Sequence, residues 1–89
     1  MIEAEVTIAN RLGLHARAAA RFVHLANTFR SRVTVAKDGT RVDGKSILGL
    51  LTLAAAKGSR LRLIIEGEDE RSALEELAGL VRRSFGEED

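Results

Sequence analysis

Apolar residues recur with two different spacings along this chain, and the order of the segments with each spacing limits the folds that the chain can adopt. Apolar and polar side chains alternate in residues 2–8, 32–37 and 60–66, and the hairpin signal Asp38-Gly39 predicts a short returning strand in residues 40–43. A period of two predicts strands that have one buried face. Residues 16–29 and 69–85 instead carry apolar side chains at spacings of three and four, which predicts helices. Residues 46–56, which are apolar nearly all round after Ser46, are predicted to form another helix. The predicted order of elements is therefore βαββαβα.

Four one-sided strands and three one-sided helices predict an α+β fold. The expected architecture is a two-layer open-faced sandwich, with a four-stranded sheet and three helices on one of its faces. Asp38-Gly39 is typical of a type I′ hairpin turn, so the sheet should be mainly antiparallel. The 89 residues contain no linker-like stretch and no internal repeat, so residues 1–89 are expected to form a single domain.

Polar residues and glycines mark where the helices should begin and end. Ser46 is suited to be the N-cap of the second helix, and Asp69 that of the third. Gly58 is expected to end the second helix in a left-handed conformation. Residues 86–89 should form a solvated tail. The expected buried stripe of the third helix consists of Leu74, Leu77, Ala78, Val81 and Phe85.

Composition argues against several classes of function. The absence of cysteine excludes disulfides and thiolate nucleophiles, and two histidines without clustered carboxylates give no reason to expect a metal or another cofactor. A net charge of +1, with three phenylalanines as the only aromatic residues, argues against nucleic-acid binding. No apolar run approaches the ~20 residues of a membrane span, and Glu3 and Glu5 interrupt any signal-peptide core. A cytoplasmic monomer is the expectation.

Chemistry is predicted for Gly13-Leu14-His15-Ala16-Arg17, where an irregular loop turns into the first helix. His15 falls at or next to the first helical residue, where backbone amides have no partner within the helix and the dipole is positive. Such a helix end favours anions, phosphate above all. Histidine forms covalent intermediates, so His15 can accept a phosphoryl group. The amides of Ala16 and Arg17 and the Arg17 guanidinium are expected to stabilise that group.

This motif, on a βαββαβα chain of this length, resembles the HPr family, the histidine-containing phosphocarriers of the bacterial phosphotransferase system. The resemblance extends over the chain and includes Gly44-Lys45-Ser46-Ile47-Leu48 and Ala56-Lys57-Gly58. It implies that enzyme I passes a phosphoryl group from phosphoenolpyruvate to Nδ1 of His15, which delivers it to an enzyme IIA domain for sugar uptake. Ala18 stands where the family usually has proline. We expect a slightly less rigid first helical turn and unchanged chemistry.

The same resemblance suggests a regulatory site and a docking surface. Ser46 matches the family's regulatory serine, which implies an HPr kinase/phosphorylase as a further partner. Phosphate at a helix N-terminus would be tolerated there and would repel acidic partners. Ile47 and Leu48 are predicted to dock enzyme I and enzyme IIA, because an apolar second helix must leave some side chains exposed. Arg21 is a candidate docking residue on the exposed face of the first helix, whereas His24 is expected to be merely solvated.

Other functions stay open at this point. Arginine and helix-end amides also suit a small phosphate-hydrolysing enzyme of two-layer α/β build, such as an acylphosphatase, although only Asn10 is placed to position water. Within the family, a nitrogen-branch or purely regulatory relative is the alternative to the sugar branch, because Ala18 is atypical.

Overall fold

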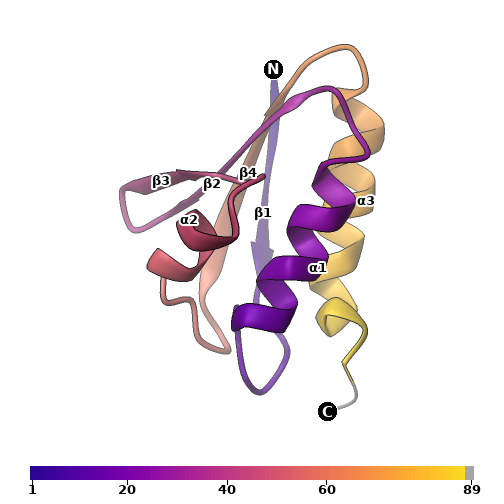
Figure 1. Cartoon of the computed structure of the whole chain (residues 1–89). Helices are drawn as coiled ribbons and strands as arrows, with labels where there is room; N and C mark the ends of the chain where they lie inside the picture. Colours follow the sequence, from indigo (N-terminus) through magenta and orange to yellow (C-terminus); the bar gives the residue numbers. More distant parts are fainter. Residues whose placement is uncertain (88–89) are drawn as a thin grey trace.

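The computed structural model describes residues 1–87 and has the predicted order of elements (Figure 1). They are β1 (Ile2–Thr7), α1 (Ala16–Ala26), β2 (Arg32–Lys37), β3 (Thr40–Asp43), α2 (Ile47–Thr52), β4 (Arg60–Glu66), α3 (Glu70–Arg82) and the short 3₁₀ helix η1 (Ser84–Gly86). The four strands form one sheet in the order β1-β4-β2-β3, and every neighbouring pair is antiparallel. The prediction of an α+β open-faced sandwich is confirmed.

The core lies between the sheet and the helices because each element has one apolar face. Alternate strand residues point inward, among them Val33, Val35 and Leu63. Phe22 of α1 and Leu77 of α3 meet them from the helical layer and are 2% and 0% exposed. Figure 1 shows α1 and α3 lying side by side in that layer, with the shorter α2 beside α1 and near β3.

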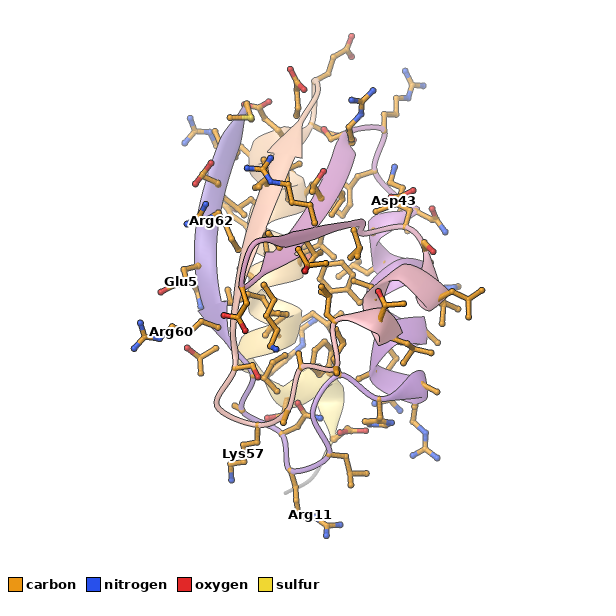
Figure 2. All side chains as sticks on the ribbon, turned by 90° about the vertical axis from the view of Figure 1, so that its left-hand side faces the viewer. Glu5, Arg11, Asp43, Lys57, Arg60 and Arg62 are labelled. Atoms are coloured by element: carbon orange, nitrogen blue, oxygen red, sulfur yellow. The ribbon has the colours of Figure 1, made fainter. Side chains whose placement is uncertain are left out.

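The other face of the sheet is open and charged. Figure 2 shows Glu5, Arg60 and Arg62 along β1 and β4, with their side chains in solvent. Arg62 forms an ion pair with Glu3 across the two strands, at 3.6 Å. Alternation along these strands therefore separates a buried apolar face from a solvated one, as expected.

The hairpin between β2 and β3 has the predicted turn. Asp38 and Gly39 both have positive φ, at 50° and 84°, and Lys37 pairs with Thr40. Two central residues with positive φ are the requirement of a type I′ turn.

Two helices end earlier than predicted. The first ends at Ala26 rather than Phe29, because the amides of Thr28 and Phe29 bond to carbonyls three residues back. The second was expected to continue to about Ala56 but ends at Thr52, and the chain leaves it through Ala54, whose φ is +49°. Leu53 and Ala55 enter the core from outside the helix.

The predicted cap role of Gly58 is wrong. Gly58 does have a left-handed φ of +92°, but it lies six residues beyond the end of α2, in the turn before β4. Its amide donates to Ile8 O at 2.8 Å and so extends the contact between the segments that flank β1 and β4.

Asp69 occupies the N-cap position of α3 but forms no side-chain cap there. Its carboxylate instead accepts from the amides of Arg30 and Ser31, at 2.9 and 3.0 Å, and from the Ser31 hydroxyl. These hydrogen bonds lower the pKa of Asp69. The residue predicted to cap a helix therefore ties that helix to the loop between α1 and β2.

The buried stripe of α3 differs in part from the predicted one. Leu77, Ala78 and Val81 are buried as expected, whereas Leu74 is only half-buried. Ala73 and Leu80 are buried as well. Phe85 is buried too, but it belongs to η1 and not to the helix.

The predicted solvated tail is wrong for Glu87. Ser84 and Phe85 have positive φ, at 58° and 56°, and turn the chain back on itself after α3. Burial of the Phe85 side chain anchors that turn, and Glu87 is left against the start of α1. Gly86 is exposed, and residues 88–89 lie outside the described part of the chain.

Candidate functional site

His15 is the N-cap residue of α1, where sequence reasoning placed it. Its backbone is extended, with φ −80° and ψ −179°, and its side chain accepts a hydrogen bond from the Arg17 amide. The atoms are Nδ1 and the backbone nitrogen, 3.3 Å apart. The ring is partly exposed, with 26% of the side-chain surface open to solvent. One ring nitrogen therefore faces the free amides of the first helical turn.

The loop before His15 is pinned to the segment that follows α2. The Leu14 amide donates to Ala55 O at 2.8 Å, and the Leu14 side chain is buried. Gly13 has a φ of +69°, and a Cβ atom at that position would lie 2.9 Å from the Ala56 Cα atom and overlap Ala55 O. Only glycine fits at position 13 without displacing the neighbouring backbone of Ala55 and Ala56.

Asn10 braces the same loop from inside. It is fully buried, and its Nδ2 donates to Gly13 O at 2.8 Å. The same nitrogen donates to Glu87 Oε1, also at 2.8 Å. Asn10 therefore connects the loop before His15 to the C-terminal segment.

Glu87 completes the surroundings of the imidazole ring. Its Oε2 lies 2.6 Å from His15 Nε2, on the side of the ring opposite the Arg17 amide. Burial alone would raise the pKa of Glu87, but the hydrogen bonds from Asn10 and His15, with the charge of Arg21, outweigh it and lower the pKa. The carboxylate is therefore ionised at neutral pH.

Arg17 and Arg21 are both exposed on α1, but they are used differently. No hydrogen bond or ion pair of the Arg17 guanidinium is found within residues 1–87, whereas Arg21 Nη1 donates to Phe85 O at 2.6 Å. Arg21, proposed from sequence for docking, thus also holds the C-terminal turn. His24 is exposed, as predicted.

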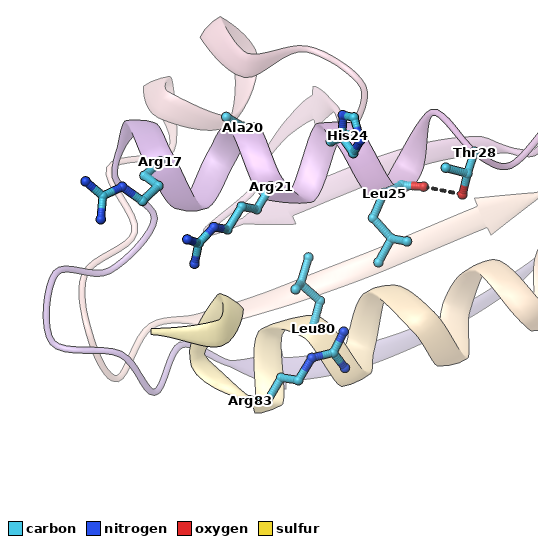
Figure 3. A pocket seen from close by; sticks show the side chains of 8 residues that line it. All are labelled: Arg17, Ala20, Arg21, His24, Leu25, Thr28, Leu80 and Arg83. Carbon is cyan, nitrogen blue, oxygen red and sulfur yellow. Dashed lines mark hydrogen bonds between the residues drawn. The ribbon is translucent and has the colours of Figure 1, made fainter. Parts of the chain in front are cut away.

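A groove of about 490 Å³ lies between α1 and α3, beside this arginine pair (Figure 3). Ala20, Leu25 and Leu80 contribute apolar side chains to it. The groove is also lined by Arg17, Arg21, His24, Thr28 and Arg83, so none of its lining residues within 1–87 is acidic. This side of α1 is electrostatically suited to an acidic surface.

Ser46 is the N-cap of α2, as predicted, and its hydroxyl accepts from the Gly49 amide at 3.0 Å. The next two residues, Ile47 and Leu48, are 40% and 77% exposed, which agrees with the expectation that part of α2 is uncovered. Leu12, in the loop before His15, is also 60% exposed, and sequence reasoning did not single it out.

Sequence reasoning also missed Glu87. The residue looked like part of a charged tail, and 72 positions separate it from His15. No local pattern signals the contact, because it depends on where the buried Phe85 directs the chain.

Over residues 1–87, no group of three or more His, Asp or Glu side chains gathers in a way that could hold a metal ion. In the same part of the chain, none of the helices combines the length and the apolar character that crossing a bilayer requires.

Comparison with known proteins places this geometry in one family. Residues 2–83 match the family model described as the PTS HPr component phosphorylation site. The chain is 47% identical to the phosphocarrier protein HPr of Neisseria meningitidis, over 98% of both chains. It resembles the crystal structure of HPr from Thermoanaerobacter tengcongensis with a TM-score of 0.96 and 43% identity, over 100% of both chains.

A second kind of relative is also similar to this chain. The catabolite repression protein Crh of Bacillus subtilis is 46% identical, with a TM-score of 0.77 over 94% of this chain and 97% of that one. Its crystal structure is described as a domain-swapped dimer.

Proposed function

The chain belongs to the HPr family, and on that premise we propose that it carries a phosphoryl group on His15. Enzyme I is the donor and enzyme IIA domains of sugar uptake are the acceptors. The observation that carries the proposal is the position of His15 Nδ1 at the N-terminus of α1, 3.3 Å from the Arg17 amide. Residues 1–89 would act as one domain of this kind, in the cytoplasm, without a cofactor.

The groups around Nδ1 have different roles in phosphoryl transfer. The lone pair of a neutral imidazole attacks phosphorus, and a new Nδ1–P bond forms as the bond between phosphorus and the donor breaks. The backbone amides of Ala16 and Arg17 lie in the first turn of α1. Once the phosphoryl group is on Nδ1, these amides can donate hydrogen bonds to its oxygens. The Arg17 guanidinium, exposed at the same end of α1, offsets the charge on the transferring group.

Docking is assigned to the surfaces on either side of His15. Ile47 and Leu48 offer exposed apolar contact from α2, and Arg21 contributes positive charge from α1. An acidic, partly apolar partner surface fits this combination. The complexes should be transient, because a carrier must leave each partner after transfer.

The test mixes the protein with phosphoenolpyruvate and enzyme I and follows its mass. One phosphate should be gained by the native chain and by His24→Ala, and none by His15→Ala. Arg17→Ala should keep the fold but accept the group about tenfold more slowly, since one charge-assisted contact is lost. A gain by His15→Ala, or an inactive His24→Ala, would contradict the assignment.

A purely regulatory role is the second candidate, and the likeness to Crh favours it. Ser46 is accessible enough for modification, being half-buried at the start of α2. With ATP and an HPr kinase/phosphorylase, the native chain should gain a phosphate that Ser46→Ala cannot accept. A regulatory protein would gain this phosphate alone, whereas a carrier also gains the one on His15. A nitrogen-branch protein would pass the phosphoryl group of His15 only to a nitrogen-specific enzyme IIA.

A phosphate-hydrolysing enzyme would behave differently in the same mixture. It would release inorganic phosphate repeatedly, whereas a carrier accumulates one acid-labile phosphohistidine. Membership of the HPr family supports the carrier.

A further inference from the structure

We propose that Glu87 is a positioning residue that keeps the His15 proton on Nε2, so that Nδ1 is the nitrogen that takes up and releases the phosphoryl group. The proposal rests on the carrier function given above and assigns a part in it to the C-terminal segment.

The contacts on the two sides of the ring require the same tautomer. An ionised carboxylate only accepts hydrogen bonds, so the 2.6 Å contact from His15 Nε2 to Glu87 Oε2 requires a proton on Nε2. A backbone amide only donates, so the contact of the Arg17 amide with Nδ1 requires a lone pair on Nδ1. A neutral imidazole has one N–H and one lone pair, and the two partners assign them in this way.

Glu87 is itself held in place. Its other oxygen accepts from the buried Asn10, and Arg21 fixes the preceding turn by donating to Phe85 O. Phe85 is 1% exposed, and the Glu87 side chain is 13% exposed. The carboxylate thus reaches His15 from an anchored turn, with hydrogen bonds to both of its oxygens.

A retained Nε2 proton matters in both directions of transfer. When the Nδ1 lone pair forms its bond to phosphorus, the electron pair of the breaking bond returns to the donor and the ring gains positive charge. Glu87 lies against that charge. When the group leaves, the Nδ1–P electron pair returns to the ring, and neutral imidazole departs with its proton still on Nε2. Without that proton the leaving group would be an imidazolate anion, which is far poorer.

The first test is an NMR measurement of the imidazole nitrogens in the unphosphorylated full chain at neutral pH. Native His15 should be in the Nε2–H form, and Glu87→Ala should show a mixture of both tautomers. Glu76→Ala, which removes an exposed carboxylate from α3, is the matched control and should keep the native spectrum. A native Nδ1–H tautomer, or an unchanged spectrum in Glu87→Ala, overturns the proposal.

Glu87→Gln gives a sharper test. Asn10 Nδ2 is directed by its bond to Gly13 O and donates toward residue 87. The glutamine must therefore offer its oxygen to Asn10 and its NH₂ group to His15. An NH₂ group there requires a lone pair on Nε2, so this variant should favour the Nδ1–H form. A native tautomer in Glu87→Gln contradicts the argument.

Transfer from enzyme I supplies the functional readout. Glu87→Ala should accept the phosphoryl group about tenfold more slowly, and Glu87→Gln more slowly still, because its reactive lone pair is removed. If the native chain accepts no phosphate, the carrier function fails, while the NMR spectra still test the tautomer. If native transfer proceeds and Glu87→Ala is equally fast, only the role of Glu87 is overturned.

Discussion

At the scale of single residues, the site is one imidazole ring held from two directions. The helix amide of Arg17 faces Nδ1, and the carboxylate of Glu87 faces Nε2. The ring's position depends in turn on Gly13, whose left-handed backbone lets the loop lie directly against Ala55. Gly13, which has no side chain, is therefore the residue near His15 that we expect to tolerate substitution least.

Gly13→Ala should lower the free energy of unfolding by about 2–4 kcal/mol, because backbone strain at φ +69° adds to overlap with the Ala55 backbone. Gly39→Ala is the control. Gly39 has a similar φ of +84°, but a Cβ atom there would meet nothing within 4 Å, so strain alone should cost about 1 kcal/mol. Urea unfolding of both variants measures the difference, and equal losses would mean that the packing of Gly13 is unimportant.

At the scale of elements, the ends of helices are determined by tertiary hydrogen bonds as much as by local sequence. Ser46 is an N-cap as its type predicts, and its hydroxyl bonds the Gly49 amide. Asp69 is an equally favourable residue type for an N-cap, but its carboxylate accepts hydrogen bonds from the amides of Arg30 and Ser31 instead. The three hydrogen bonds available in that loop outweigh the one that a cap would provide.

The link between Asp69 and the loop should make stability depend on pH. The pKa of Asp69 is lowered by hydrogen bonds from Ser31 and Arg30, so folding is favoured while the carboxyl is ionised. This contribution is fully present above about pH 4, where an unfolded aspartate is also ionised, and is lost as the pH falls through the lower folded-state value.

Asp69→Ala should therefore be less stable than the native chain at pH 7, and the difference should shrink below about pH 4. Urea unfolding at several pH values checks this, with Glu76→Ala as the control at an exposed position of α3. A difference that is constant from pH 7 to pH 3 would show that the ionised form does not matter.

At the scale of the whole molecule, a two-layer fold leaves one face of the sheet charged and little apolar surface uncovered. The large exposed apolar side chains within residues 1–87 are Met1, Leu12, Ile47 and Leu48. These side chains are few for the core of a stable interface of about 1,600 Å², and on the proposed function we expect a monomer that meets its partners transiently.

Light scattering coupled to gel filtration should give the mass of one chain across a wide concentration range. The alternative outcome is a dimer, as described for Crh. A mass of two chains that persists on dilution would contradict the monomer and would point to exchange of an element between copies.

The sequence alone determined the order of elements, the antiparallel hairpin and the helix start at His15, because each depends on neighbours within a few positions. Spacings of two and three to four residues decide which face is buried, and Asp38-Gly39 decides the turn by its positive φ. The early end of α2, the use of Asp69 and the approach of Glu87 to His15 were decided only by the tertiary structure. Each of these depends on a hydrogen bond or a buried side chain from a distant segment, and no local pattern encodes which distant partner a polar group will find.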